Sequence, residues 1–179
     1  MIFSETKLHG AFFINPEKYE DVRGEFFRTY CSDEFQKNGI HFSILQSSIS
    51  VSRNRGTLRG MHFQRPPHEE AKLVRCIRGS VYDVIIDLRP DSTTFKKWIS
   101  VELGEAIGNA LYIPKGFAHG FLSLSDNAAL LYQMDEYYQP LSACGVRWDD
   151  PEFGISWPIT DPSMSEKDRN WNNFLEKNR

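Results

Sequence analysis

The chain has only three cysteines and no long hydrophobic run. Cys31, Cys76 and Cys144 lie far apart, without the paired spacing of a zinc site or a disulfide framework. The N-terminus lacks the basic start and the apolar segment of a secretory signal, and no segment approaches the length of a membrane span. These absences predict reduced thiols, no membrane association and a cytoplasmic location.

The chain also has no large excess of positive or negative charge. The formal net charge is -3, which gives no broad attraction for nucleic acid or an anionic membrane, although a local basic cleft could still hold a phosphorylated small molecule. A hydrophobic fraction of 40% and an aromatic fraction of 13% are typical of an ordered globular protein. The length of 179 residues predicts a single domain over residues 1–179, with a small-molecule partner rather than a polymer.

Helical periodicity is scarce, and strand patterns dominate. Strand-like runs broken by Gly, Pro, Asp or Asn cover residues 72–78, 81–88, 98–103, 110–113, 120–124 and 128–134. Because no strand–helix–strand alternation is present, these short spacings predict an antiparallel sandwich or barrel. Only two short peripheral helices are expected, one over Ser32 to Asn38 after a Ser cap, and one near Trp171 to Lys177, with Ser165 as a capping candidate.

Polar residues interrupt these apolar runs. Alternate residues of a strand face the same side, so a barrel can direct them into one cavity. An imidazole or an ammonium among apolar strand residues has a desolvation cost that chemistry or a partner must offset. The pairing of His62 with Lys72 suggests proton abstraction next to a carbonyl, and its alternative is a hydrogen-bonded core histidine beside an outward-facing lysine. The polar residues in or beside apolar segments are Gln46, Arg59, His62, Lys72, His119 and Tyr132.

A series of motifs then runs through the chain in order. They are Asp21-Val22-Arg23-Gly24, Gln46, Leu58-Arg59-Gly60-Met61-His62-Phe63-Gln64, Lys72-Leu73-Val74-Arg75, residues 112–121, Leu131-Tyr132, Tyr137-Tyr138, residues 147–151 and Ser165-Glu166-Lys167-Asp168. In these motifs and their spacing the chain resembles the dTDP-4-dehydrorhamnose 3,5-epimerase family over nearly its whole length. The resemblance implies an all-β, cupin-type double-stranded jelly roll, a homodimer, and a cofactor-independent, metal-free epimerase of a nucleotide-linked 4-keto-6-deoxy sugar, serving surface-polysaccharide or other deoxysugar synthesis.

The same resemblance implies the catalytic roles. His62 matches the family's base, Asp168 the carboxylate paired with it, and Tyr132 the proton donor. A hydrogen beside a ketone is only moderately acidic, so a base must be positioned against it, and the enolate oxygen needs a fixed positive charge such as Lys72. The alternatives are that Asp168 merely caps the tail helix and that Tyr132 is a core aromatic.

Further residues are assigned to substrate binding by the resemblance. Arg23 and Arg59 suit a diphosphate as bidentate donors, with surface ions as the alternative. Tyr138 matches a residue that stacks on the nucleotide base, and His119 a substrate contact; packing and a buried hydrogen bond are their alternatives. The full expected set is Arg23, Phe26, Arg28, Gln46, Ser48, Arg59, His119, Tyr138 and Lys167.

Three places depart from the family pattern at the nucleotide end of the ligand. Arg28 stands where the family has Glu, Ser47-Ser48 where it has Asp-Asn, and Ala143 where it has Glu. A glutamate suits the N–H of thymine, whereas the donor Arg28 suits the bare ring nitrogen of cytosine or the acceptor edge of guanine. A CDP- or GDP-linked sugar is therefore an alternative to the dTDP form, and inversion at C3 alone, at C5 alone or at both is open.

Two other functions fit parts of the sequence. A metal-dependent cupin would use His62, His68, Glu69 and His119 as ligands. Metal cupins usually carry two histidines separated by one residue, which hold the ion from one strand face. Here Phe63-Gln64 follows His62, so that pair is missing. A catalytically silent sugar-nucleotide binder is the third reading, and it is disfavoured because base, carboxylate and phenol are all present.

Overall fold

The computed structural model describes residues 1–174, and this part of the chain is almost entirely β-structure. Its elements are β1 (Ile2–Glu5), β2 (Phe12–Asn15), β3 (Tyr19–Asp21), β4 (Gly24–Phe26), α1 (Ser32–Lys37), β5 (Gln46–Ser52), β6 (Leu58–Gln64), β7 (Lys72–Arg78), β8 (Ser80–Asp87), β9 (Trp98–Gly104), β10 (Ala110–Ile113), β11 (Phe117–Ser123), β12 (Ala128–Met134), β13 (Ala143–Gly145) and α2 (Glu166–Arg169).

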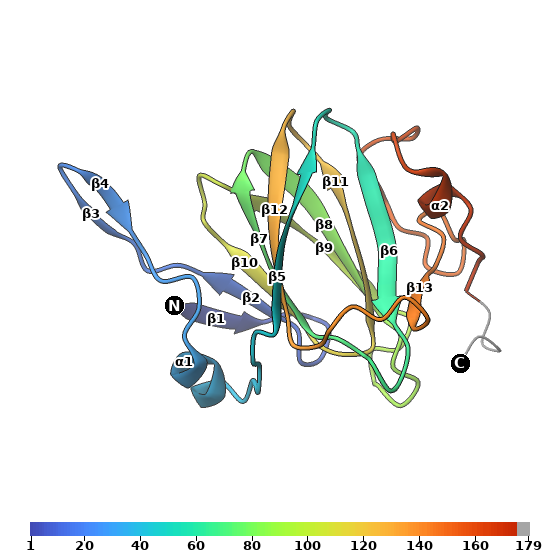
Figure 1. Ribbon diagram of the computed structural model, residues 1–179, viewed down its shortest axis with the longest axis horizontal. Coiled ribbons are helices and arrows are strands. Elements are labelled where there is room, and N and C mark those ends of the chain that lie inside the picture. The colour runs from blue at the N-terminus through green and yellow to red at the C-terminus, as the bar shows by residue number, and fades with distance from the viewer. Residues whose placement is uncertain (175–179) are drawn as a thin grey trace.

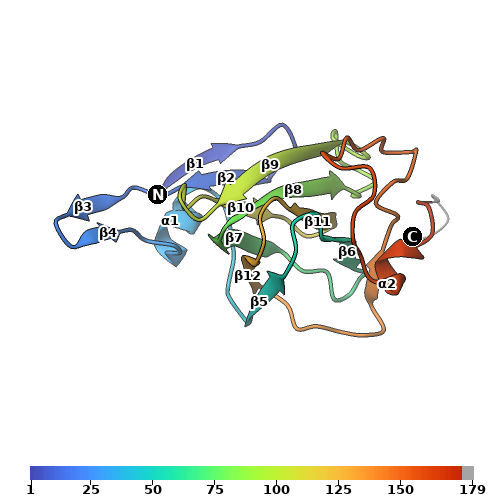
Figure 2. The ribbon, with the colours of Figure 1, turned by 90° about the horizontal axis from the view of Figure 1, so that it is seen from above.

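Two antiparallel sheets form the body of the molecule (Figures 1 and 2). One has the order β1-β2-β10-β7-β12-β5 and the other β13-β6-β11-β8-β9. Apart from the pairs β1–β2 and β8–β9, neighbouring strands in each sheet are non-consecutive in sequence, as in a jelly roll. The predicted all-β jelly roll of the cupin type is confirmed, and each strand-like run of the sequence coincides with a strand, most of them within a residue or two.

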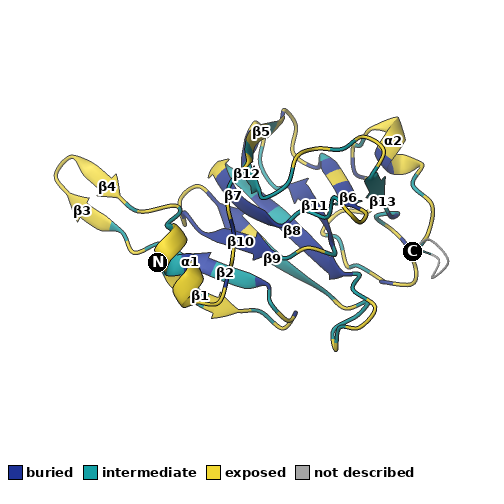
Figure 3. Ribbon diagram, turned by 60° about the horizontal axis from the view of Figure 1, so that its bottom comes forward, coloured by how far each residue is buried: buried dark blue, intermediate teal, exposed yellow. Residues whose placement is uncertain are grey.

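Alternation along the strands builds the core between the sheets. Val74 and Cys76 of β7 and Val81 and Ile85 of β8 belong to one buried apolar cluster, and Figure 3 shows the buried residues concentrated along these central strands. Since side chains two apart share a face, a polar residue at a core-facing position points into the interior. Polar residues at such positions on both sheets can therefore line a cavity between the sheets.

The first helix covers the outer face of the six-stranded sheet. Phe35 is its buried residue, and it packs with Ile14, Leu73 and Tyr112 of that face. The helix begins at Ser32, and Cys31 occupies the N-cap position without a side-chain hydrogen bond. The prediction that Ser32 caps this helix was therefore wrong, because Ser32 is the first helical residue and the N-cap is the residue before it.

The second helix is shorter than the sequence suggested. Ser165 does cap it, since its hydroxyl accepts a hydrogen bond from the backbone N–H of Asp168 at 3.1 Å. The helix ends at Arg169, so the helix predicted from Trp171 is wrong for residues 171–174, and its remainder lies outside the described residues. Neither helix in residues 1–174 is long and apolar enough to cross a bilayer.

A β-hairpin projects from the body on the side of the N-terminus (Figure 1). Its strands β3 and β4 form a two-stranded sheet of their own. Tyr19, Val22 and Phe26 on this hairpin are exposed. Within the described residues, no other element packs over these apolar side chains. An isolated hairpin is only marginally stable in water.

Candidate active site

Two histidines lie side by side on neighbouring strands. β6 pairs with β11 so that His62 is opposite His119. Two glycines bring the strands this close: a Cβ placed on Gly60 would lie only 2.6 Å from Cα of Gly120, and Gly60 has φ +146, a conformation that side chains rarely allow. The glycines of these motifs therefore permit the close backbone approach of β6 and β11 beside the two histidines.

Asp168 holds one of these imidazoles. Its Oδ1 lies 2.7 Å from Nε2 of His62, and its side chain is 8% exposed against 43% for His62. Burial raises the pKa of Asp168, but the hydrogen bond and charge of His62, together with hydrogen bonds of the Gly60 backbone and Ser165, hold the pKa below its usual range. The pair leaves Nδ1 of His62 as the ring nitrogen that can take a proton from a ligand.

Lys72 and Tyr132 occupy the facing sheet. Nζ of Lys72 lies 3.0 Å from Oε1 of Glu70, and its ammonium is buried. Burial raises the pKa of Tyr132 well above its usual range, the negative charge of Asp83 adds to this, and the nearby Arg59 cation opposes it. Tyr132 therefore carries a phenolic proton that it can donate, with a cation near enough to stabilise the phenolate.

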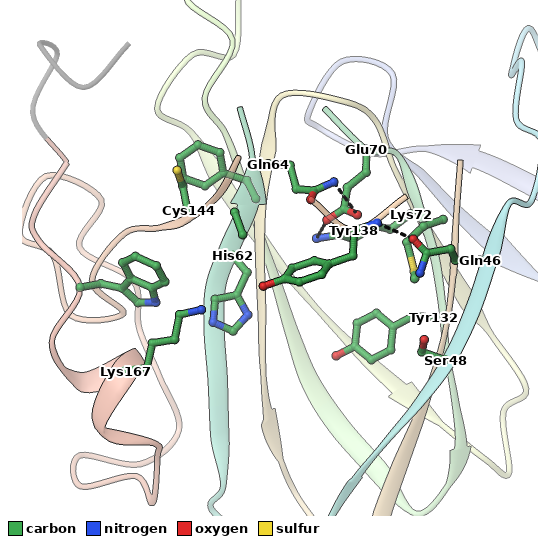
Figure 4. Close-up of a pocket in the computed structure, with 14 residues that line it drawn as sticks. Gln46, Ser48, His62, Gln64, Glu70, Lys72, Tyr132, Tyr138, Cys144 and Lys167 are labelled. Carbon is green, nitrogen blue, oxygen red and sulfur yellow. Dashed lines mark hydrogen bonds and ion pairs between the residues drawn. The ribbon is translucent and has the colours of Figure 1, made fainter. Parts of the chain in front are cut away.

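These groups surround one continuous depression between the sheets. Figure 4 shows His62 and Tyr132 on opposite sides of it. Two adjoining volumes of about 320 and 260 Å³ share Ser48, His62, Lys72 and Tyr132, a size that suits a small ligand. The first volume is also lined by Gln46, Tyr138 and Lys167, and the second by Arg59, His119 and Asp168.

Three of the expected substrate contacts lie elsewhere. Arg23 and Phe26 line a separate depression on the hairpin, with a volume of about 450 Å³. Arg28 donates from Nη1 to Oε1 of Glu34 at 2.6 Å and lines neither volume next to His62. Within one chain, the sequence motif around Arg23 is thus not brought to the depression that holds His62.

Comparison with known proteins identifies the family. The sequence model of the dTDP-4-dehydrorhamnose 3,5-epimerase family matches residues 5–176. The chain belongs to this family. A dTDP-4-dehydrorhamnose 3,5-epimerase of Methanothermobacter thermautotrophicus is 46% identical over 177 residues, which are 97% of this chain and 95% of that protein. The resemblance read from the motifs is therefore confirmed.

Solved structures of the epimerase family share the whole fold. The enzyme of Elizabethkingia anophelis superposes with a TM-score of 0.96 at 38% identity, covering 100% of this chain and 99% of that one. A Legionella pneumophila dTDP-6-deoxy-D-glucose-3,5-epimerase, solved in complex with dTDP-4-keto-L-rhamnose, has a TM-score of 0.90 at 34% identity and covers 96% of this chain and 92% of its own. The jelly roll around the depression is thus the family architecture.

Sequence reasoning missed several groups of this epimerase site. Glu70 forms the ion pair with Lys72, and Nε2 of Gln64 lies 3.4 Å from Oε2 of the same carboxylate. Asp83 was detectable, because it interrupts the core-facing positions of β8 between Val81 and Ile85. No local signal marks Trp171, whose ring centroid lies 6.3 Å from that of His62.

The four ligands of the metal-cupin alternative do not assemble. Across residues 1–174 no three His, Cys, Asp or Glu side chains converge in a metal-binding group. Glu69 lines a different groove, together with Arg65 and Arg89. Nε2 of His62 and Nε2 of His119 each face a carboxylate instead.

Proposed function

We propose that the protein is a nucleotide-sugar 3,5-epimerase, which inverts the carbons beside the ketone of a dTDP-4-dehydro-6-deoxyglucose-type sugar to give the dTDP-4-dehydrorhamnose type. The observation that carries the proposal is the placement of the His62–Asp168 pair and the Tyr132 phenol on opposite sheets across one depression (Figure 4). A base on one face and an acid on the other are what inversion of a carbon next to a carbonyl requires.

The chemistry needs no electron acceptor from outside the site. His62 takes the proton from the carbon beside the ketone, and the electron pair of the C–H bond moves to the carbonyl oxygen. The buried ammonium of Lys72 stabilises that enolate oxygen. Tyr132 then gives its proton to the other face of the carbon, Arg59 favours the phenolate left behind, and solvent restores both residues. We infer from this scheme that no cofactor or metal takes part.

The nucleotide part of the proposal rests on the relatives. The Legionella pneumophila structure contains dTDP-4-keto-L-rhamnose, which supports dTDP for this chain. Arg28, in place of the glutamate expected in the family, keeps the CDP or GDP form as the second candidate, because a donor at the base edge would favour those bases.

An NMR time course in heavy water tests the function and the nucleotide together. The dTDP, CDP and GDP forms of one 4-keto-6-deoxy sugar are incubated separately with the protein. We expect deuterium at C3 and C5 of the dTDP form, because each deprotonated carbon recovers its hydrogen from solvent. Label at one carbon alone would make the enzyme a single-centre epimerase, and turnover of the CDP or GDP form would identify the second candidate. Absence of label with all three would overturn the proposal.

We also propose that the working molecule is a homodimer in which the hairpin completes the partner's site. The hairpin is the support for this: it exposes Tyr19, Val22 and Phe26, and it carries Arg23, a diphosphate candidate that lies outside the depression of its own chain. A second copy covering these apolar side chains would stabilise the hairpin and add a guanidinium to the substrate site.

Subunit mixing tests this arrangement. Arg23→Ala and His62→Asn proteins should each be weak, because one lacks a diphosphate contact and the other lacks the base. In a mixed dimer one of the two sites receives an intact hairpin and an intact His62, so an equimolar mixture should recover about a quarter of wild-type activity. A mixture no more active than the average of the two variants would show that Arg23 serves its own chain.

The remaining expectations follow from this function. We propose a cytoplasmic enzyme of surface-polysaccharide or other deoxysugar synthesis, working as a single domain over residues 1–179. Cys31, Cys76 and Cys144 are free thiols, and this supports the location because reducing compartments keep thiols free.

A further inference from the structure

A second histidine–carboxylate pair lies next to the first and is buried more deeply. Oδ2 of Asp83 lies 2.9 Å from Nε2 of His119, and the two side chains are 0% and 4% exposed. The other oxygen of this carboxylate, Oδ1, is buried and has no hydrogen-bond partner among the described residues. A carboxylate that is wholly buried and half satisfied is costly, so its position on the core side of β8 needs an explanation beyond packing.

The geometry of the second pair repeats that of the first. In both, Nε2 of the imidazole meets the carboxylate, and Nδ1 has no hydrogen-bond partner within residues 1–174. His62 and His119 are cross-strand neighbours on β6 and β11, and both line the same volume of about 260 Å³. Nδ1 is therefore the ring atom through which each histidine can meet a ligand.

The short contact between Asp83 and His119 fixes the place of one proton. Burial raises the pKa of Asp83 above its usual range, and the charge and hydrogen bond of His119 and the charge of Lys72 oppose that rise. An ionised Asp83, whose Oδ2 lies 2.9 Å from Nε2 of His119, can only accept a hydrogen bond, so it requires a proton on Nε2. A neutral imidazole with its proton on Nε2 presents the lone pair of Nδ1.

We propose that Asp83 is a positioning residue that holds His119 as the Nε2–H tautomer, so that Nδ1 accepts a hydrogen bond from a hydroxyl of the hexulose. This rests on the proposed epimerase function. The ketone oxygen of the sugar has no proton to donate to Nδ1, so it accepts a hydrogen bond from the Lys72 ammonium. The hydroxyl on the carbon next to the ketone donates to Nδ1 of His119. The second pair thus selects the orientation of the sugar in front of His62.

The tautomer can be read directly. In protein labelled with ¹⁵N, two-bond proton–nitrogen correlation spectra distinguish Nε2–H, Nδ1–H and doubly protonated imidazoles, and a His119→Gln sample assigns the signal. We expect the Nε2–H pattern in the wild-type protein without ligand. A wild-type spectrum showing Nδ1–H, or both nitrogens protonated, would overturn the proposal even if no variant could be made.

Asp83→Asn adds a functional readout. The amide can donate to Nε2, which moves the imidazole proton to Nδ1 and turns an acceptor into a donor. We expect the spectrum to change to Nδ1–H and KM to rise about ten- to hundredfold. An analogue of the substrate without the hydroxyl beside the ketone should bind both proteins equally weakly. Retention of the Nε2–H pattern with wild-type KM would contradict the assignment.

Asp87→Asn is the matched control. Asp87 lies on the same strand β8 and is equally buried, but it accepts from Arg89, Ser92 and Thr94 in a loop outside the depression. Its loss should lower the melting temperature without moving the His119 signal or KM. Tautomer spectra do not depend on turnover, so a protein with the expected spectra but no deuterium exchange would separate failure of the proposed function from failure of this inference.

Discussion

Replacing His62 with Asn is expected to lower kcat by about a hundred- to ten-thousandfold and to abolish deuterium uptake at both carbons. The imidazole is the group placed to take the proton, and Asp168, 2.7 Å from its Nε2, stabilises the imidazolium that forms. Asparagine, like histidine, carries a planar polar group on its Cβ, but it has no basic nitrogen. Binding of the nucleotide sugar, measured by calorimetry, should remain largely intact because the remaining lining residues are unchanged.

His41→Asn is the control for this experiment. His41 is an exposed histidine that lines none of the volumes beside His62, so its replacement should leave the rate and the label uptake at wild-type values. Deuterium uptake by the His62→Asn protein at a rate close to that of wild type would mean that another group removes the proton, and the catalytic assignment would then be lost.

Replacing Tyr132 with Phe is expected to separate exchange from inversion. His62 can still remove the proton, and because its side chain is 43% exposed the imidazolium can trade that proton with solvent. Without the phenol on the opposite sheet, the carbon receives its hydrogen back from the face that lost it. The substrate should therefore gain deuterium while product formation falls about a hundredfold or more, as followed by NMR of both species.

Two other tyrosines sharpen that test. Tyr30→Phe removes a hydroxyl that donates to the carbonyl of Phe42 at 2.7 Å, outside the depression, and it should cost about 1 kcal/mol of stability with no change in the ratio of exchange to inversion. Tyr138 also lines the larger volume. Loss of inversion in Tyr138→Phe, with normal inversion in Tyr132→Phe, would transfer the donor role to Tyr138.

The strands of the body could be predicted because their signal is local. The strand-like runs over residues 72–78 and 128–134 form β7 and β12 with the same bounds, since apolar and β-branched residues bounded by turn residues are a signal carried by the run itself. The helix ends were less predictable. The predicted cap, Ser32, lies one residue after the observed N-cap, Cys31, and the tail helix ends at Arg169, because capping depends on backbone geometry that a single residue type does not specify.

The site divides in the same way. Gln46, Lys72 and Tyr132 interrupt apolar strands, and this anomaly is visible in the sequence because buried polar groups need partners. Glu70 and Trp171 carry no such mark, since a charged residue in a loop and an aromatic residue in a tail are both ordinary. The hairpin with Arg23 shows that a motif can be recognised in the sequence without revealing its position. The motif belongs to the family pattern, yet the fold of its own chain does not bring it to the depression beside His62.

By itself the sequence determined the class of fold, the family and the chemical types of the proposed catalytic groups, because strand patterns are local and the family motifs can be recognised by their order along the chain. Only the tertiary structure decided which ring nitrogen of His62 and of His119 meets a carboxylate, and that Tyr132 faces His62 from the other sheet. Those relations depend on strand register and on contacts between residues such as 62 and 168, which packing of the whole chain brings together.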